Sequence, residues 1–472
     1  MDKTGRIGRN ITAQLLSQIG IKLLNIAVSL LLVRWLGPAR LGAYAYISAF
    51  CYPFGALGDV GLGSLAVREI SRDPEVEAET LGAVRRLYGS LALLSTSAML
   101  TVAVLTRHDI RTIAAISLMG CVTLFTSITA PYLVAMTARE DLHRLSLHQS
   151  AGGLSGAAIT LGILWAGGGV TALFLGAVVS SLLAFFLARA LAGNVPRHGD
   201  VPWPTCLALL RKAIPFGLVL VGFTVYYRLD MIMLRWYWPA EEVGRYAAAY
   251  RFLDAMLVLG AALGAPFYPR LARLTTRDPS AAITVLDTAY RMTLLIGIPL
   301  ATGATLVADS LTSNLFGTRF LDSANLARLL VWAGLPVLLV AVPSHALNAA
   351  NRTWLMAYTY WLMVIVNFTA NLFLIPRWGA EGACISTIGC NWAILGLVLW
   401  GTKKELGALS STRTAWRYAL ASAGMAIMLH IAHGWGLGLE ILLGVGTYLT
   451  GLLFLGYWTS QDFQMLREAL AS

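Results

Sequence analysis

Charged residues are scarce in this chain of 472 residues, because Asp, Glu, Lys and Arg together make up only 12% of it. A soluble domain usually carries roughly 25%. Hydrophobic residues instead reach 57%, and the mean hydropathy is +0.68. A membrane-spanning helix takes about 20 largely apolar residues, and the apolar runs provide about fourteen such stretches. The composition therefore excludes an ordinary soluble protein and predicts an all-α polytopic membrane protein.

Cysteine is also rare, and the five cysteines show no spacing typical of a metal site. We expect them to be small core residues rather than disulfide partners. The sequence further lacks the Gly-Lys-Ser/Thr loop that binds nucleotide phosphates, so ATP is not the expected direct energy source. We predict no catalytic residue, no metal site and no cofactor other than a coupling ion, H⁺ or Na⁺.

The positions of lysine and arginine predict the orientation of the chain, because these residues concentrate in cytoplasmic loops. With the N-terminus inside, 22 of the 35 Lys and Arg residues fall in cytoplasmic segments or at the span ends beside them, 9 in outer loops or at the span ends beside them, and 4 deeper within spans. We therefore expect a multi-pass protein of the cytoplasmic (inner) cell membrane with both termini in the cytoplasm. The net charge of +11 follows from this asymmetry and does not indicate a nucleic-acid partner. The predicted spans are 12–33, 41–63, 84–106, 112–137, 144–165, 170–191, 210–234, 244–268, 287–308, 326–350, 353–375, 380–400, 415–433 and 437–458.

Charged side chains within the predicted spans are the candidate functional residues. Each costs at least ~2.5–3.5 kcal/mol in a bilayer, so it tends to face a cavity and serve a function there. The candidates for binding an anionic substrate are the cations Lys22, Arg228, Arg251 and Arg291. The candidates for ion coupling are the carboxylates Asp59, Asp230 and Asp254.

Several of these residues have an alternative, structural interpretation. Arg251 and Asp254 stand at i,i+3 and can form a local ion pair, as can Asp287 and Arg291 at i,i+4. Long cationic side chains can also reach to the interface. Asp59 can cap a helix that is broken within GALGDVGLG. Arg228 and Asp230, two residues apart, point to nearly opposite sides of a helix and cannot satisfy each other.

Two sequence repeats divide the chain. RWLGPARLGAYAY (34–46) matches RWYWPAEEVGRY (235–246), and WAGGGVTA (165–172) matches WGAEGACI (378–385). Six predicted spans separate the copies of each pair, so both halves enter the membrane with the same polarity, as in parallel-repeat transporters. We expect two pseudo-symmetric six-helix lobes, residues 1–200 and 201–402, followed by two C-terminal helices in 403–472.

Prolines and loop composition predict where helices bend and end. Within the inner loop 64–83 we expect a short surface helix that is broken at Pro74, and 192–209 is expected to connect the lobes. Prolines inside spans bend a helix by removing a hydrogen bond. The prolines predicted to lie inside spans are Pro53, Pro131, Pro215, Pro266, Pro299, Pro336 and Pro343.

Several segments resemble polysaccharide-transport (Wzx-type) oligosaccharide flippases of the MOP (multidrug/oligosaccharidyl-lipid/polysaccharide) exporter superfamily. DMIMLRWYWPAEEVGRYAAAYRF is similar to the junction of spans 7 and 8 in that family, and NLFLIPRWGAEGACISTIGCN (371–391) to the junction of spans 11 and 12. RWLGPARLGAYAY and residues 297–320 resemble its span 1–2 junction and its span 9 with the following loop.

The resemblance implies two six-helix lobes around a central cavity, two extra helices, and alternating access. It also implies that a polyprenyl-diphosphate-linked oligosaccharide moves from the cytoplasmic to the outer leaflet for cell-surface polysaccharide biosynthesis. The expected partners are this lipid-linked oligosaccharide, membrane lipids, and a glycan polymerase or other proteins of the export pathway. Such a protein is a secondary-type transporter and not an enzyme.

Three other functions remain open at this point. A peptidoglycan lipid-precursor flippase moves a similar substrate. An ion-coupled multidrug antiporter of the same superfamily would need an acidic or neutral cavity, and the excess of basic groups argues against it. A membrane-embedded glycan polymerase or ligase would carry a large outer loop with catalytic residues, whereas the longest outer loop here covers about residues 309–325.

The partition of Lys and Arg gives a direct test of topology. In a cysteine-free background, Asp322→Cys is expected to react in intact cells with a maleimide that cannot cross the membrane, because the 309–325 loop is predicted to lie outside. Arg72→Cys, in an inner loop, serves as the control and should react only after permeabilisation. Labelling of Asp322→Cys from the cytoplasmic side alone would contradict the orientation.

Overall fold

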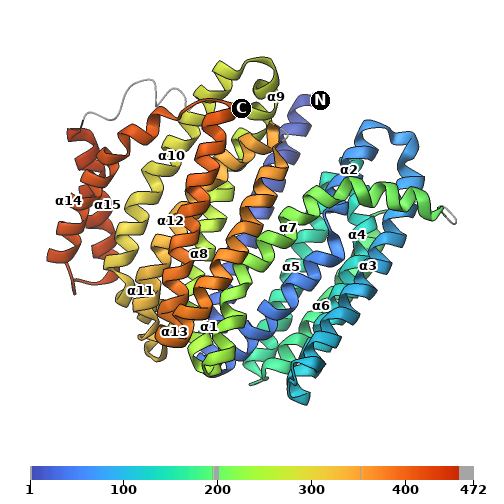
Figure 1. Ribbon diagram of the computed structural model, residues 1–472, viewed down its shortest axis with the longest axis horizontal. Coiled ribbons are helices and arrows are strands. Elements are labelled where there is room, and N and C mark those ends of the chain that lie inside the picture. The colour runs from blue at the N-terminus through green and yellow to red at the C-terminus, as the bar shows by residue number, and fades with distance from the viewer. Residues whose placement is uncertain (1–2, 194, 196–200, 351, 456–472) are drawn as a thin grey trace. The chain divides into compact units, whose positions relative to one another are not determined.

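The computed structural model describes residues 3–193, 195, 201–350 and 352–455, and within these the chain is helical, without a β-strand (Figure 1). Ten helical segments of this part of the chain are long and apolar enough to cross a membrane. All five cysteines are free, and four of them are buried, as expected for small core residues. The predicted class of an all-α polytopic membrane protein is confirmed.

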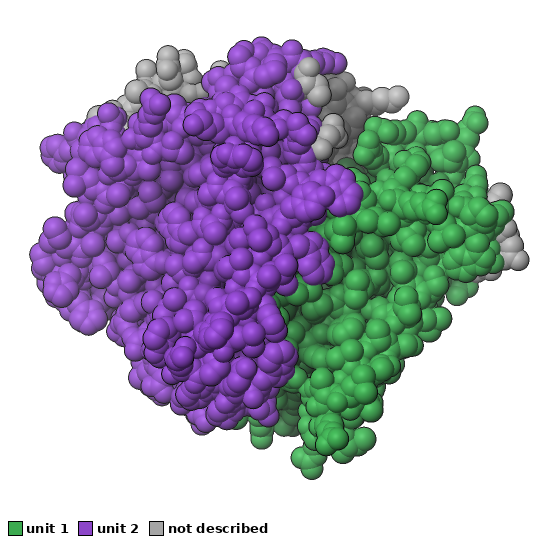
Figure 2. Space-filling model, viewed as in Figure 1, with its two compact units in different colours: residues 1–232 green, residues 233–472 purple. Residues whose placement is uncertain are grey.

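The chain divides into two compact units, Met1–Ile232 and Met233–Ser472, coloured separately in Figure 2. The first unit contains α1 (Lys3–Asp59), α2 (Leu62–Arg72), η1 (Pro74–Val76), α3 (Glu77–Leu105), α4 (Ile110–Ala138), α5 (Leu142–Trp165), α6 (Val170–Leu191) and most of α7 (Trp203–Tyr237). The second contains α8 (Ala240–Gly264), η2 (Ala265–Phe267), α9 (Tyr268–Arg277), α10 (Pro279–Leu306), α11 (Ala308–Phe316), η3 (Thr318–Phe320), α12 (Ser323–Ala349), α13 (Thr353–Glu405), η4 (Ser410–Thr414), α14 (Ala415–Ile431) and α15 (Leu437–Phe454).

The two longest helices, α1 and α13, each join two spans across a glycine. Gly37 in α1 has φ 70° and ψ 171°, and Gly379 in α13 has φ 53° and ψ −131°. Residues with a Cβ rarely adopt these angles, which explains why glycine stands at both breaks. If α1 and α13 are each counted as two, the long helices of the described residues match the predicted spans in number and order.

Both sequence repeats lie at junctions between consecutive spans. Residues 34–46 contain the break in α1, and residues 235–246 contain the α7–α8 junction. Residues 165–172 join α5 to α6, and residues 378–385 contain the break in α13. Each motif therefore recurs at the same place in the helix order, six spans later. The lobe boundaries 1–200 and 201–402 stay a prediction.

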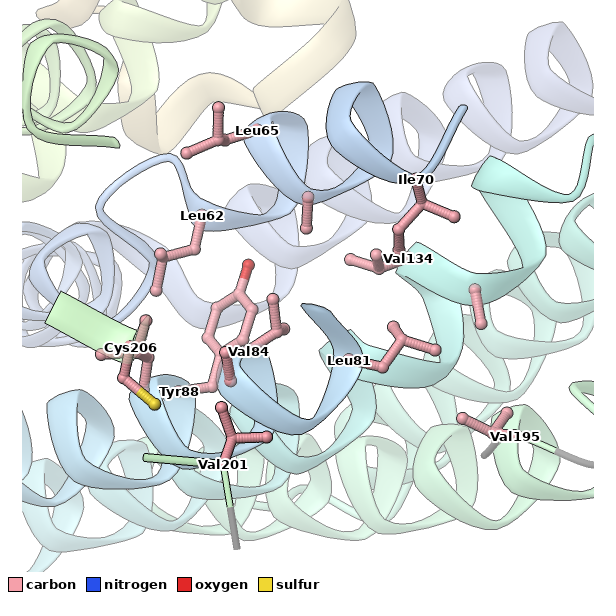
Figure 3. Packing of buried hydrophobic residues seen from close by; sticks show 14 of the residues in the cluster. Leu62, Leu65, Ile70, Leu81, Val84, Tyr88, Val134, Val195, Val201 and Cys206 are labelled. Atoms are coloured by element: carbon pink, nitrogen blue, oxygen red, sulfur yellow. The ribbon is translucent and has the colours of Figure 1, made fainter. Parts of the chain in front are cut away.

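The surface helix predicted in the first inner loop is confirmed as α2, which ends at Arg72 just before Pro74. Its apolar residues recur at helical spacing and lie on one face, which is buried against α3 and α4 (Figure 3). These residues are Leu62, Leu65, Ala66 and Ile70. Arg68 and Arg72 are exposed. Val201 and Cys206 join the same cluster, so the start of α7 is fixed to the α2–α3–α4 core.

Most of the prolines lie where predicted. Six of the seven occur inside helices α1, α4, α7, α10 and α12. Pro266 was predicted wrongly to lie within a span: α8 ends at Gly264, and Pro266 lies in the 3₁₀ turn η2. Its ring and missing N–H end the α-helix there. Two further prolines, Pro38 and Pro376, lie beside the glycine breaks of α1 and α13.

Within the second unit, helices α14 and α15 pack against α10. The carboxylate of Asp287 accepts hydrogen bonds from the hydroxyl of Ser410 (2.6 Å) and from the backbone N–H (2.8 Å) and hydroxyl (2.7 Å) of Ser411. The hydroxyl of Tyr448 in α15 donates to the carbonyl of Leu295 (2.8 Å). Asp287, which the sequence allowed as a partner of Arg291, thus has its hydrogen bonds to the segment before α14.

Two aspartates outside the spans cap helices. Asp109 accepts hydrogen bonds from the hydroxyl and N–H of Thr112 at the start of α4, and the hydroxyl bond chiefly lowers the pKa of this carboxyl. Asp278 does the same at the start of α10, where the hydroxyl of Ser280 is the main cause of a lowered pKa. Both fit the usual N-cap role of aspartate.

The close packing beside the break in α13 predicts that replacing Gly382 by alanine destabilises the protein. A Cβ at Gly382 would lie 2.6 Å from the backbone carbonyl carbon of Leu374, which cannot move away easily. Gly389, on the same helix, has nothing within 4 Å. Gly382→Ala is expected to cost about 1–3 kcal/mol, typical of overpacking, whereas Gly389→Ala should be neutral or stabilise by roughly 0.5–1 kcal/mol. Thermal unfolding of the two detergent-purified variants measures the difference, and equal melting temperatures would contradict it.

Candidate functional site

The predicted cation Arg228 lies on α7 in the first unit and packs on an aromatic ring. Its guanidinium carbon is 4.7 Å from the ring centroid of Tyr52 in α1. Tyr52 is 50% exposed, and Arg228 is half-buried. Within the described residues Arg228 has neither a carboxylate partner nor a hydrogen bond. The guanidinium is therefore held by its face while its N–H donors stay available.

A backbone contact between α7 and the turn after α1 holds the two helices together. A Cβ on Gly61 would lie 2.7 Å from Cβ of Phe216, and one on Gly217 would lie 2.8 Å from the carbonyl oxygen of Val60. Gly61 has φ +73° and Val60 has φ 46°, an unusual conformation for a β-branched residue. The contact lies next to Pro215, which bends α7.

Asp59 lies at the C-terminal end of α1, beside this contact. Its carboxylate accepts a hydrogen bond of 2.5 Å from the hydroxyl of Tyr88 in α3. Asp59 is therefore the last residue of α1 and is hydrogen-bonded to the neighbouring span α3. Asp230, the other predicted carboxylate of this unit, is 2% exposed. Arg228 and Asp230 do not pair with each other, as their spacing predicted.

In the second unit the predicted local pair of α8 is present. Nη1 of Arg251 lies 3.5 Å from Oδ2 of Asp254, and both side chains are about 30% exposed. Arg291 lies half-buried on α10. The side chain of Lys22, on α1, lies outside the described residues. The structure thus places Arg228, Arg251 and Arg291 on helices long enough to span a membrane, with Arg228 against an aromatic ring and Arg251 beside a carboxylate.

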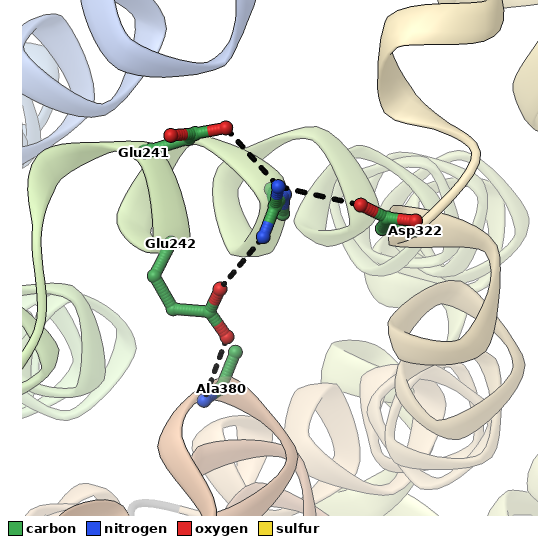
Figure 4. Close-up of polar contacts among 5 residues, drawn as sticks. Glu241, Glu242, Asp322 and Ala380 are labelled. Carbon is green, nitrogen blue, oxygen red and sulfur yellow. Dashed lines mark hydrogen bonds and ion pairs between the residues drawn. The ribbon is translucent and has the colours of Figure 1, made fainter.

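The α7–α8 junction contacts the break in α13, so two of the family-like segments pack together. The indole N–H of Trp238 donates to the carbonyl of Ile375 (2.9 Å), and the N–H of Ala380 donates to Oε1 of Glu242 (3.4 Å). Oε2 of Glu242 lies 3.5 Å from Nη1 of Arg245, and Nη2 of Arg245 lies 3.0 Å from Glu241 and 3.3 Å from Asp322. Figure 4 shows Glu242 between these polar contacts and Ala380. These contacts hold the non-helical turn at Gly379.

Sequence reasoning missed a buried polar network between the two halves of α13. The amide of Asn371 donates to Asn367 (2.9 Å), and that of Asn367 donates to Ser386 (3.1 Å). Asn391 donates to the carbonyl of Ala333 in α12 (3.0 Å). All four side chains are at most 4% exposed. Asparagines inside an apolar run were the available signal, because membrane helices use such residues to bond across their interfaces.

Two tyrosines were also missed, Tyr52 and Tyr88. Both lie in apolar spans, where tyrosine is unremarkable, and neither belongs to a motif. Their role depends on which helices become neighbours, which no local pattern in the sequence encodes. The only signal was that a charged residue within a span requires some partner.

These features define a class: a multi-pass α-helical membrane protein with charged groups held within its helices. The family model described as "Polysaccharide biosynthesis protein" matches residues 7–275, more than half of the chain. The model "Lipid II flippase MurJ" matches residues 245–458. The protein therefore belongs to the polysaccharide biosynthesis protein family, and the resemblance to Wzx-type members of the MOP superfamily is confirmed.

Two curated relatives come from Haloferax volcanii. The probable low-salt glycan biosynthesis flippase Agl15 is 22% identical over 170 residues, which cover 35% of this chain and 36% of that protein. The probable flippase AglR is 24% identical over 250 residues, 52% of this chain and 51% of that protein. The chain thus matches about a third to a half of the length of these relatives.

Solved structures share the fold. The lipid II flippase MurJ in an inward closed conformation superposes with a TM-score of 0.78 and 14% identity, covering 94% of this chain and 98% of that one. An inward-facing multidrug resistance MATE transporter of the MOP superfamily has a TM-score of 0.65 and 15% identity, covering 83% and 96%. Identities this low show the fold alone.

Proposed function

We propose that this protein is a flippase that moves a polyprenyl-diphosphate-linked oligosaccharide from the cytoplasmic to the outer leaflet of the cytoplasmic membrane. The movement serves cell-surface polysaccharide biosynthesis and proceeds by alternating access, with both termini in the cytoplasm. The family match over residues 7–275 and the glycan-flippase names of the two relatives support this proposal.

The observation that carries the proposal is Arg228, a cation on a membrane helix without a carboxylate partner among the described residues. A diphosphate head leaving water must exchange its hydration for cationic donors, because an unpaired buried charge costs several kcal/mol. Arginine offers several N–H donors to a phosphate. Lys22, Arg251 and Arg291 are the further cations proposed to contact the substrate.

A peptidoglycan lipid-precursor flippase is the second candidate. The lipid II flippase model matches residues 245–458, and the fold of MurJ superposes over most of the chain. Both candidate substrates carry a polyprenyl diphosphate, so the cation argument serves either. An ion-coupled multidrug antiporter, which the MATE fold likeness also admits, is disfavoured by a cation in this position.

Loss of charge at Arg228 or Lys22 tests the proposal. Cells whose gene carries Arg228→Gln or Lys22→Gln should export the glycan about 10- to 100-fold less, since a hydrogen bond to a charged group is worth about 1.5–3 kcal/mol. Mass spectrometry should find the lipid-linked oligosaccharide accumulating, and its mass identifies the glycan. Arg228→Lys should keep part of the activity because it keeps the charge.

Arg211→Gln is the matched control, because Arg211 is exposed near the start of the same helix α7. It should export normally at the same expression level. Accumulation of a peptidoglycan precursor in place of an oligosaccharide lipid would favour the second candidate. Full export by the double Lys22→Gln, Arg228→Gln variant would remove these cations from the substrate path.

We further propose that an ion gradient or the membrane potential drives transport, with H⁺ or Na⁺ as the coupling ion and Asp59 as the first carboxylate to test. In proteoliposomes, flipping should follow an imposed pH, sodium or voltage gradient without ATP. Asp59→Asn should remove the response to the gradient, and Tyr88→Phe, which removes the one hydroxyl bonded to Asp59 among the described contacts, should weaken it. Flipping that needs ATP and ignores all three gradients contradicts the mechanism.

A further inference from the structure

A substrate-binding arginine inside a membrane protein must be stabilised without losing its N–H donors or its charge. The contact between Tyr52 and Arg228 meets both requirements. A cation in a low-dielectric region is normally stabilised by a carboxylate. That carboxylate would occupy the in-plane N–H donors and neutralise the charge that an anionic substrate needs. Arg251 shows this arrangement, with its Nη1 directed at Asp254. Arg228 has the ring of Tyr52 instead.

An aromatic ring stabilises a guanidinium through its negative face. The stack uses the flat face of the guanidinium and leaves its N–H donors, which lie in the plane, free for another acceptor. Phosphate is the acceptor that this planar fork fits, through two parallel N–H···O bonds. Tyr52 therefore stabilises and orients the cation without consuming its donors or its charge.

The contact between α7 and the turn after α1 brings the ring and the guanidinium together. The backbones meet at Gly61 in this turn and Gly217 in α7, where a Cβ on Gly61 would lie 2.7 Å from Cβ of Phe216 and one on Gly217 would lie 2.8 Å from the carbonyl oxygen of Val60. Tyr52 lies nine residues before Gly61, and Arg228 lies eleven residues after Gly217. At a helical rise of 1.5 Å per residue, these separations are about 14 Å and about 16 Å. The two helices thus run antiparallel, and the close contact sets the register at which ring and guanidinium meet.

We propose that Tyr52 is a positioning residue that holds Arg228 for a phosphate group of the substrate's diphosphate. This rests on the proposed function, because it assigns Arg228 to substrate binding. The chemistry recognised is a diphosphate, which a polyprenyl lipid or free inorganic diphosphate can supply.

The test measures binding by purified full-length protein in nanodiscs, with farnesyl diphosphate and inorganic diphosphate as probes and farnesol as the uncharged control. Replacing Tyr52 by 3,4,5-trifluorophenylalanine keeps the shape of the ring and weakens its negative face. Farnesyl diphosphate should then bind about 3- to 30-fold more weakly, the range expected for a cation–π contact. Tyr52→Phe should bind like the wild type, and farnesol should bind all variants alike.

A double-mutant cycle makes the dependence on Arg228 explicit. Arg228→Gln should weaken diphosphate binding, and adding Tyr52→Leu to it should cause no further loss. Competition by inorganic diphosphate with the same dependence on Tyr52 would show that the diphosphate alone is recognised, and its failure to compete would show that the lipid tail is also required. The matched control is Trp203→Leu, which removes a different cation–π contact of this unit, to Arg86 at 5.5 Å.

The outcomes separate the two proposals. If Arg228→Gln weakens binding while trifluorophenylalanine at position 52 and Tyr52→Leu do not, the positioning role is wrong and the proposed function stands. If Tyr52 and Arg228 govern diphosphate binding as described while Arg228→Gln exports glycan normally, the positioning role stands and the proposed function is wrong. Unchanged binding by Arg228→Gln overturns both.

Discussion

The cost of holding a charge away from water governs how this protein arranges the side chains of its spans. A charged residue in a bilayer costs at least ~2.5–3.5 kcal/mol, so each one needs compensation. Three solutions occur: Arg251 has a carboxylate one turn away, Asp59 has the hydroxyl of Tyr88, and Arg228 has the ring of Tyr52. Only the first neutralises the charge. In the first unit Arg228 and Asp59 therefore both contact neutral groups, so in these contacts neither is paired with an opposite charge.

Close backbone contacts decide where these side chains lie. In the first unit Gly61 and Gly217 let the turn after α1 touch α7, and this contact sets both the stack on Arg228 and the place of Asp59. In the second unit Gly379 and Gly382 let α13 break and fold back on itself. A Cβ on Gly61, Gly217 or Gly382 would lie less than 3.0 Å from a neighbouring atom, and Gly379 has a φ of 53° that residues with a Cβ rarely adopt. Small residues that allow backbones to approach are the usual basis of helix packing in membranes.

The sequence predicted the spans and the surface helix α2 because hydropathy and helical spacing are local properties. It failed at Pro266, since an apolar window does not distinguish the last turn of a helix from the 3₁₀ turn η2 that follows. It predicted Arg228 as a candidate but not Tyr52, because their contact depends on how the chain brings α7 near α1. The hydrogen bonds of Asn367 and Asn371 could not be predicted for the same reason. The bond from Asn367 to Ser386 forms only when α13 folds back at Gly379, and Asn371 bonds in turn to Asn367.

The two copies of the repeated motif 34–46 and 235–246 take part in different local structures. In its first copy, Gly37 and Pro38 form a bend within the single long helix α1. In its second copy the chain leaves the helix, and Trp238 and Glu242 reach the backbone of α13 at Ile375 and Ala380. The break at Gly379 frees backbone groups, and buried backbone groups need hydrogen-bond partners. Segment 235–246 supplies two of them to segment 371–391, through Trp238 and Glu242.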